Sequence, residues 1–273
     1  MIWGLIISYK SDNMKRKLYI VEGLPCTGKS TAAKFVAEKT GGIYVDEGNG
    51  NHPADYEFQA FIPDRALGGF SEDEKEILLG CAVKRENGII VPLSELKDEL
   101  FEKALKFKIY DFLDWETERG VMLDKWREFA ENCGEKAYVF NCVFLQNPMC
   151  ETMMRFNFDV NVSFNYINEI CRITAPLEPL IIYLKNDNEA ESVKNAVKER
   201  GGEWLNAVVD YHCNGGYGKA NGLSGFDGYI KALEERQRRE LEILAKLPVK
   251  SIVIDNPQRD YEQAYKKIEE VIK

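Results

Sequence analysis

Short apolar segments recur along the chain and are separated by longer stretches whose apolar residues follow a helical spacing. The short segments are continuous rather than alternating, which is typical of strands buried on both faces of a parallel sheet. We expect five strands, at residues 17–22, 42–45, 137–144, 179–184 and 249–254. The pattern therefore predicts an α/β fold in which a five-stranded parallel sheet carries helices on both faces.

The interval between the second and third predicted strands is about ninety residues long, which is more than a crossover connection requires. Residues 51–76 are acidic, aromatic and irregular in pattern, whereas residues 94–107 and 116–133 have a helical pattern. We interpret residues 50–135 as a helical insertion that faces the substrate. The alternative is that the insertion is structural elaboration.

Residues 23–30 read GLPCTGKS, a complete G-x-x-x-x-G-K-S sequence, between the first predicted strand and a helical segment at 30–39. This context is typical of a phosphate-binding loop (P-loop), in which glycines let backbone N–H groups point into an anion-sized hollow. Lys29 can reach the β- and γ-phosphates, and the Ser30 hydroxyl can ligate Mg²⁺. We therefore expect ATP and Mg²⁺ as cofactors, bound by Gly23, Leu24, Pro25, Cys26, Thr27, Gly28, Lys29, Ser30 and Thr31.

The chain has 273 residues, of which 45% are hydrophobic and 30% are charged. This composition suits one large domain, at residues 14–273, with an apolar core. Residues 1–13 precede a second methionine, Met14, and are expected to be an appended or disordered leader or a packed edge segment. The apolar run at 2–7 is too short to span a membrane, and no targeting signal is evident, so we expect a cytoplasmic protein without membrane contact.

The net charge is -9 and the isoelectric point is near 5.1. A protein with this charge does not hold nucleic acid through its general surface field, so a small anionic substrate has to be met by a local basic pocket. The seven cysteines form no C-x-x-C pair, which favours reduced thiols over disulfides or zinc. The sequence is also compatible with a homodimer.

Three segments resemble the deoxynucleoside kinase and thymidylate kinase branch of the P-loop kinases: YIVEGLPCTGKST, YVDEGN and YLKNDNEAESVKNAVKERGGEW. The resemblance covers most of the chain in architecture and implies a P-loop NTPase fold. Residues 47–56 are also similar to an E-G-N-x-x-H-P-A-D-Y stretch of an uncharacterised group of bacterial kinase-like proteins. The resemblance implies that Glu47 accepts the proton of the substrate hydroxyl, with Asp46 as the competing candidate. A carboxylate beside a P-loop can also orient a hydroxyl for in-line attack on physical grounds alone.

The third of these segments is similar to the lid of the same kinases, in which spaced basic residues close over the phosphates. The resemblance implies this role for Lys194, Lys198 and Arg200, and a sugar-contacting role for Glu203. A spacing of four places Lys194 and Lys198 on one helix face, and Arg200 matches phosphate oxygens best because its guanidinium is planar. We expect residues 185–225 to form this lid together with a mobile loop.

The end of the third predicted strand departs from the family pattern. These kinases carry an acidic–arginine pair there, whereas residues 140–144 read FNCVF, without a charge. Either Asn141 and Gln146 take over the polar positioning, or the substrate and the metal are handled differently. Arg155 and Arg172 are candidate replacements for the missing arginine.

Two histidines and a glycine-rich segment complete the candidates. His52 follows Glu47 by five residues and is interpreted either as a hydrogen-bonding partner of the substrate or as a structural residue, and His212 is interpreted as structural. The glycines of residues 214–225 predict a mobile loop, which either gates the site or connects helices.

These features favour a small-molecule kinase that moves the γ-phosphoryl group of ATP to a nucleoside or nucleotide, or to a hydroxylated antibiotic. The alternative is a nucleotide-binding regulatory ATPase, which would need an aspartate at the end of an apolar strand, and Asp255 comes nearest. In the kinase interpretation the catalytic residues are Lys29, Glu47 and Arg200, the substrate-binding residues are Asp46, Glu47, His52 and Glu203, and the metal ligand is Ser30.

Overall fold

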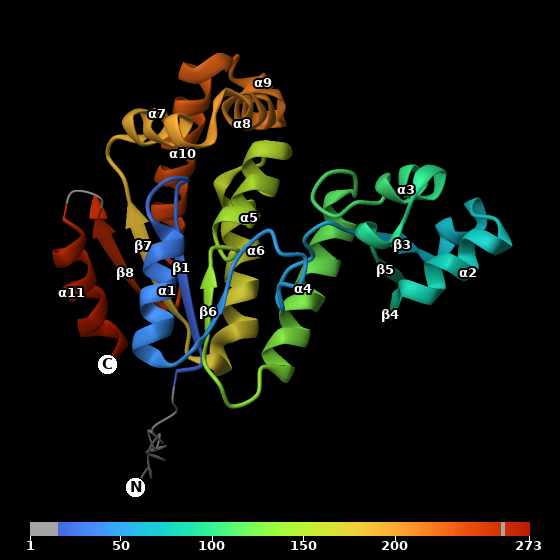
Figure 1. Cartoon of the computed structure of the whole chain (residues 1–273), viewed down its shortest axis with the longest axis horizontal. Helices are drawn as coiled ribbons and strands as arrows, with labels where there is room; N and C mark the ends of the chain where they lie inside the picture. Colours follow the sequence, from blue (N-terminus) through green and yellow to red (C-terminus); the bar gives the residue numbers. More distant parts are fainter. Residues whose placement is uncertain (1–15, 258–259) are drawn as a thin grey trace, which may run out of the picture.

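A five-stranded parallel sheet forms the centre of the computed structural model, which describes residues 16–257 and 260–273 (Figure 1). Its order is β2-β6-β1-β7-β8, and every neighbouring pair is parallel. The strands are β1 (Leu18–Gly23), β2 (Ile43–Val45), β6 (Tyr138–Asn141), β7 (Leu180–Lys185) and β8 (Lys250–Asp255). The predicted fold class is confirmed, while the predicted leader at 1–13 lies outside the described residues.

Helices cover both faces of this sheet because its strands are apolar on both sides. In β1, Leu18 and Ile20 join one core cluster with residues of α4 (Trp115–Asn132), α6 (Val160–Thr174) and α10 (Gly225–Leu244). Tyr19 and Val21 belong to a second cluster on the opposite face. That cluster includes residues of α1 (Lys29–Thr40) and α11 (Tyr261–Ile272). Successive side chains of β1 therefore belong to two separate core clusters, one on each face of the sheet.

The insertion between β2 and β6 contains a second sheet, which the sequence analysis did not predict. It is antiparallel, in the order β3-β5-β4, and it stands apart from the central sheet in Figure 1. Its elements are β3 (Gln59–Pro63), η1 (Asp64–Gly69), α2 (Glu72–Cys81), β4 (Val83–Arg85), β5 (Gly88–Pro92), η2 (Leu93–Glu95) and α3 (Asp98–Leu105). The expectation of irregular structure at 51–76 holds for residues 51–58 and was wrong from residue 59 onward, where Ala60 and Ile62 of β3 bury a small core together with Leu78 of α2.

The segment that follows β7 forms a helical cap over the carboxyl edge of the sheet (Figure 1). The cap contains α7 (Glu189–Arg200), α8 (Gly202–Asn214) and α9 (Gly216–Ala220). Below it, β6 is followed by α5 (Gln146–Met149) and a π-helical turn, η3 (Cys150–Arg155), and the short η4 (Ala175–Leu177) precedes β7. In the part of the chain that the structure describes, no helix is long and apolar enough to cross a membrane.

Three of the glycines in 214–225, Gly215, Gly216 and Gly218, serve close packing. A β-carbon at Gly215 would lie 2.4 Å from the carbonyl oxygen of Met154, and one at Gly218 would lie 2.3 Å from that of Cys213. The sequence analysis read these glycines as a loop, whereas most of them lie in or beside α9. Their missing side chains let this short helix approach the backbone of η3.

We expect Gly218→Ala to lower the free energy of unfolding by about 1–3 kcal/mol, because the added methyl group collides with backbone atoms that cannot rotate away. Urea unfolding of the two proteins measures this difference. Gly202→Ala is the matched control, since a β-carbon at Gly202 meets nothing within 4 Å. Equal stability of the wild type and Gly218→Ala would show that α9 does not depend on this close approach.

Candidate functional site

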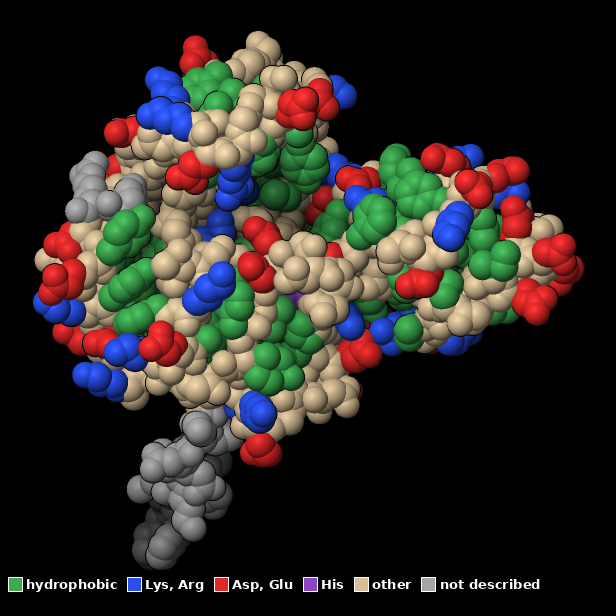
Figure 2. Space-filling model, viewed as in Figure 1, with side chains coloured by type: hydrophobic (Ala, Val, Ile, Leu, Met, Phe, Trp, Pro, Cys, Tyr) green, Lys and Arg blue, Asp and Glu red, His purple; other side chains and the backbone are tan. Residues whose placement is uncertain are grey.

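A cavity of about 680 Å³ lies at the carboxyl edge of the sheet, between the P-loop, the β6–α5 connection and helices α7, α8 and α10. Figure 2 shows the molecule hollowed beneath the helical cap. The end of β1 and the start of α1 contribute Pro25, Cys26, Gly28, Lys29, Ser30 and Thr31 to its lining. The expected position of a ligand, beyond the carboxyl ends of parallel strands, agrees with this location.

The P-loop has the backbone shape that its glycines were expected to allow. Gly23 has a φ of 142°, and a β-carbon there would lie 2.5 Å from the carbonyl oxygen of Leu184. Gly28 has a φ of 88° and caps the start of α1. The cavity lining does not include Gly23, Leu24 or Thr27. Leu24 packs in a core cluster instead, and the Thr27 hydroxyl bonds the Leu24 carbonyl oxygen within the loop. Cys26 also has a positive φ, of 67°, and its thiol faces the cavity.

The Lys29 ammonium is held inside the loop. Its side chain is 8% exposed, and Nζ donates a hydrogen bond to the carbonyl oxygen of Leu24 at 3.0 Å. The Thr27 hydroxyl donates to the same oxygen at 2.9 Å. Because Lys29 has only this one hydrogen-bond acceptor among the described residues, its remaining N–H groups are available to an anion in the cavity.

Ser30, Asn141 and Asp46 form a polar chain at the ends of three elements. The Asn141 amide nitrogen donates to the Ser30 hydroxyl at 3.1 Å and to the Asp46 carboxylate at 2.7 Å. Burial tends to raise the pKa of Asp46, but interactions that include hydrogen bonds from Asn141 and from the Glu47 amide outweigh it and hold this pKa below its ordinary value. Asp46 therefore stays ionised beside the residue that the sequence nominates as a magnesium ligand.

Glu47, and not Asp46, lines the cavity. One of its carboxylate oxygens accepts hydrogen bonds from the Gln146 amide and from the Cys142 thiol, both at 2.8 Å. The proposal that Asn141 and Gln146 take over polar positioning fits this arrangement, because the two amides hold Asp46 and Glu47 respectively.

A buried carboxylate that the sequence analysis overlooked organises this part of the site. Glu22, at the end of β1, is fully buried and accepts hydrogen bonds from the backbone N–H groups of Phe144, Leu145 and Gln146 at 2.7, 2.8 and 3.3 Å. Burial, and then the charge of Glu240, raise the pKa of Glu22 to about 7. A charged residue within an otherwise apolar strand was the available signal.

The lid residues divide into two groups. Arg200 lines the cavity, and its guanidinium lies 5.2 Å from the centre of the Trp204 ring. Lys194 and Lys198 are exposed and share a helix face, as expected, but that face is not the one toward the cavity. Lys194 lies over Phe226, and Lys198 bonds Asn195. The cavity face of α7 carries Ser192, Asn195, Ala196, Glu199 and Arg200.

Two expected substrate contacts find no support. His52 is 3% exposed, packs edge-on against Phe140 at 4.5 Å and accepts a hydrogen bond from the Ala54 amide at 3.1 Å. Burial, and then Lys125, lower the pKa of His52 to about 3, so the ring is neutral and part of the core. Glu203 is exposed, and neither residue lines the cavity.

The suggested arginine replacements are also elsewhere. Arg155 pairs with Glu118 at 3.0 Å and Glu151 at 2.7 Å, and Arg172 is exposed. A second arginine lines the cavity besides Arg200: it is Arg236 of α10, which was not among the predicted site residues. Its position in a helix with many charged residues gave no signal, because the sequence does not show which of them is buried.

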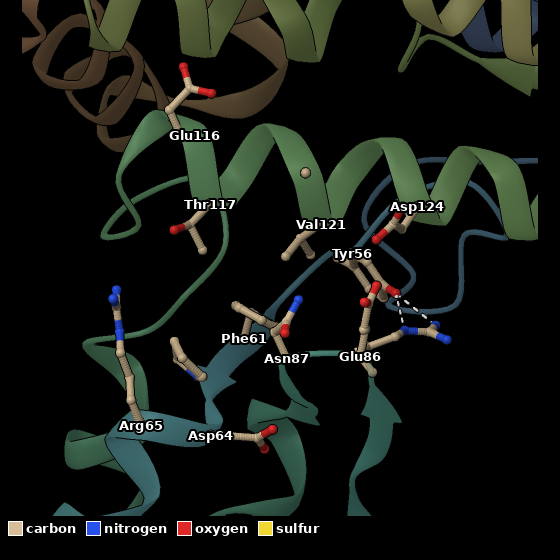
Figure 3. A pocket seen from close by; sticks show the side chains of 13 residues that line it. Tyr56, Phe61, Asp64, Arg65, Glu86, Asn87, Glu116, Thr117, Val121 and Asp124 are labelled. Carbon is tan, nitrogen blue, oxygen red and sulfur yellow. Dashed lines mark hydrogen bonds between the residues drawn. The ribbon is translucent and has the colours of Figure 1, made fainter.

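Figure 3 shows a second pocket, of about 500 Å³, between α4 and the inserted sheet. Phe61 and Val121 line it together with charged residues such as Arg65 and Asp124. The buried Tyr56 hydroxyl is already engaged there, because it accepts two hydrogen bonds from a neighbouring guanidinium. None of the residues that line this pocket lines the P-loop cavity.

Comparisons with known proteins found no matching family model and no matching curated protein. Solved structures that resemble this chain include the YorR protein of Bacillus subtilis in complex with phosphorylated GDP. The two chains are 12% identical with a TM-score of 0.43, and the match covers 93% of this chain and 95% of YorR.

Two further structural neighbours are a deoxyadenosine kinase from M. mycoides and a sugar kinase from Janibacter sp. HTCC2649. The first has 14% identity and a TM-score of 0.40, with coverage of 93% and 98%. The second has 16% identity and a TM-score of 0.35, with coverage of 93% and 92%. Similarity of this extent carries no conclusion about the substrate of this chain.

The raised pKa of Glu22 predicts a pH-dependent difference between the wild type and Glu22→Gln. From about pH 4.5, the ordinary value, to about pH 7 the folded wild type binds more protons at this residue than the unfolded chain does, so its free energy of unfolding falls as pH rises. Glutamine cannot titrate, so the stability of Glu22→Gln relative to the wild type should rise by about 3 kcal/mol across this window and then level off.

Urea unfolding at several pH values measures this difference, and other titrating groups cancel because both proteins contain them. Glu270→Gln, a change of the same kind at an exposed residue, serves as the control. A difference between Glu22→Gln and the wild type that does not vary with pH would contradict the raised pKa.

Proposed function

We propose that this protein is an ATP- and Mg²⁺-dependent phosphotransferase that moves a γ-phosphoryl group to the hydroxyl of a small molecule. The observation that carries this proposal is that one cavity is lined both by Lys29 of the P-loop and by the Glu47 carboxylate. Phosphoryl transfer depends mainly on positioning and on electrostatic stabilisation, so a phosphate cradle and an oriented carboxylate are the parts that it requires.

The P-loop supplies the phosphate site. The positive end of the α1 dipole and the loop N–H groups favour an anion above Gly28. Lys29 can exchange the Leu24 carbonyl oxygen for a phosphate oxygen by a small movement of Nζ, because the two partners compete for the same donor. The loop therefore holds the positive charge of Lys29 in place, and the negative charge of the triphosphate would balance it.

The residues around Ser30 fit a magnesium ion. Mg²⁺ takes oxygen ligands and usually keeps several waters, with one or two carboxylates and the substrate phosphates completing its shell. Ser30 offers a hydroxyl, and Asn141 links it to the ionised Asp46. When bound, the ion would neutralise charge on the transferring group, while Ser30 would ligate it directly and Asp46 would act through water.

Glu47 has the position expected of the group that orients the acceptor hydroxyl. The Gln146 and Cys142 hydrogen bonds both go to Oε2, so Oε1 remains to accept the hydrogen bond of a substrate hydroxyl. Arg200 lines the same cavity and is the cap residue best suited to stabilise the charge of the transferring phosphoryl group. Lys194 and Lys198 would reach it only after a movement of α7.

The acceptor is most simply a nucleoside or a nucleotide, with a hydroxylated antibiotic as a second candidate. The rival interpretation, a regulatory ATPase, is less favoured because Asp255 ends the edge strand β8, pairs with Lys185 at 3.4 Å and does not line the cavity. Product analysis of ATP consumption over a panel of nucleosides, nucleotides and aminoglycosides tests the proposal. Hydrolysis to ADP and phosphate that no acceptor changes would favour the ATPase.

Lys29→Ala should abolish phosphoryl transfer and leave the fold intact, because it removes the charge that follows the γ-phosphate and breaks only one hydrogen bond to a loop carbonyl. A coupled ADP-release assay measures the turnover, and circular dichroism checks the fold. Lys39→Ala removes the same charge from the last turn of the same helix and should have little effect. Near wild-type turnover in a folded Lys29→Ala protein would refute the P-loop assignment.

Glu47→Gln should lower turnover by about 10²- to 10⁴-fold with little change in ATP affinity, because glutamine keeps the shape of the side chain but cannot accept a proton. Steady-state kinetics and a separate ATP-binding titration distinguish the two effects. Asp46→Asn is the informative comparison and should raise the Mg²⁺ concentration needed for half-maximal activity. If Asp46→Asn instead shows the larger loss of turnover at saturating Mg²⁺, Asp46 is the base.

A further inference from the structure

Three buried polar side chains on α8 and α10 line the cavity, and each has a polar atom that makes no hydrogen bond to the described residues. They are Arg236, Tyr229 and His212, which are 1%, 0% and 6% exposed. Within the described residues, Arg236 Nη2, the Tyr229 hydroxyl and His212 Nε2 have no hydrogen-bond partner, and Arg236 Nε forms an ion pair with Glu240 that lacks hydrogen-bond geometry. Buried polar groups are nearly always paired, so three unpaired atoms on one cavity wall point to a ligand.

The Arg236 guanidinium is fixed by its other nitrogen atoms. Its Nε lies 2.8 Å from a Glu240 carboxylate oxygen, and Nη1 lies 3.7 Å from the Cys150 sulfur. The second Glu240 oxygen accepts a hydrogen bond from the Tyr183 hydroxyl at 2.6 Å. These contacts orient the guanidinium, and Nη2 remains a buried charged donor in the cavity wall, without a partner among the described residues.

Tyr229 and His212 add a second donor and an acceptor. Their rings lie 4.9 Å apart. His212 Nδ1 lies 2.7 Å from the carbonyl oxygen of Val208 and must donate to it, which leaves Nε2 with a free lone pair. Burial, and then the charge of Arg236, lower the pKa of His212 to about 4, so the ring stays neutral at pH 7. A hydroxyl-bearing anion, such as a singly protonated phosphate, matches all three groups.

Arg236 connects this group to the Glu47 side of the cavity through Cys150, whereas Tyr229 packs in one core cluster with Leu24 of the P-loop. Gln146, which holds Glu47, and Cys150, which contacts Arg236, are one helical turn apart, and both line the cavity. Lys29 is held instead on the P-loop side, at Leu24. The Glu47 side is where the acceptor would stand in the proposed reaction.

We propose that Arg236, Tyr229 and His212 bind an anionic group of the acceptor, and that the acceptor is therefore a phosphate monoester rather than a neutral molecule. This inference rests on the proposed phosphotransferase function and narrows its substrate class. Arg236 and Tyr229 donate to phosphate oxygens, and His212 accepts from the protonated oxygen. The phosphate then fixes the acceptor so that another of its oxygens meets Glu47.

Calorimetric titration of the full-length protein, saturated with Mg²⁺ and a non-hydrolysable ATP analogue, tests this inference. The probes are the four common deoxynucleosides, their 5′-monophosphates, and inorganic phosphate. At least one monophosphate should bind about 100-fold more tightly than its nucleoside, and inorganic phosphate should compete with it. Nucleosides that bind as tightly as their monophosphates would overturn the inference.

Variants locate the binding to the three side chains. Removal of Arg236 alone would leave Glu240 buried without its partner, so the double variant Arg236→Met/Glu240→Gln is used. It should weaken monophosphate binding by about 10- to 100-fold and leave binding of the ATP analogue unchanged. Tyr229→Phe removes only an unpaired hydroxyl and should fold normally. This variant should weaken monophosphate binding by about 10-fold.

Arg238→Met is the matched control, because Arg238 belongs to the same helix and pairs only with surface glutamates. It should bind every probe as the wild type does. The inference would be overturned in favour of a general charge effect by the following pair of results. Tyr229→Phe leaves monophosphate binding unchanged, and Arg238→Met weakens it as much as Arg236→Met/Glu240→Gln does.

The two proposals fail in distinguishable ways. If the monophosphates bind at Arg236 but no phosphoryl group is ever transferred to them, the anion site stands and the phosphotransferase function fails. If transfer to neutral hydroxyl compounds is efficient and the Arg236→Met/Glu240→Gln protein retains it, the phosphotransferase function stands and the anion site fails.

Discussion

The arrangement of the site depends on one buried carboxylate, that of Glu22. It lies at the end of the central strand and accepts three backbone hydrogen bonds from the turn that follows β6. Cys142 and Val143 have positive φ angles of 63° and 77°, and the Cys142 N–H group still bonds the Val21 carbonyl oxygen of β1, whereas the next N–H groups along the chain turn to the Glu22 carboxylate. The strain in this turn is therefore offset by hydrogen bonds to β1, the strand that also carries the P-loop.

The same turn sets the polar side chains around it. Asn141 immediately precedes it and holds Asp46 beside Ser30, and Gln146 ends it and holds Glu47. Two neutral amides thus fix two carboxylates without introducing a further charge. An arginine here would pair with the acidic residues directly, whereas amides leave both carboxylates their full negative charge. The charge of Glu47 then remains available to a hydroxyl.

The sequence predicted the features that repeat locally and missed those that depend on distant partners. Five apolar runs and the P-loop pattern were sufficient for the central sheet, because a run of buried strand residues carries its own signal. The hairpin of β4 and β5 was not predicted: it turns at Glu86–Asn87, and Gly88 already pairs with Arg85 as a strand residue. Glu22 stood out as a charge within an apolar strand, but its partners could not be predicted, and Arg236 gave no signal at all, because each gains its role from a segment more than eighty residues away.

The charge balance of the cavity explains how an acidic protein can receive anions. Lys29, Arg200 and Arg236 line it, against the carboxylates of Glu47 and Glu199. The charge of Arg236 is only partly balanced by Glu240, whose two oxygens are divided between the guanidinium and the Tyr183 hydroxyl. Burial, and then the charge of Glu240, raise the pKa of Glu22 to about 7, so Glu22 contributes less than a full negative charge near neutrality. Near neutrality a partly protonated Glu22 therefore leaves the surroundings of the cavity more positive than an ionised carboxylate would.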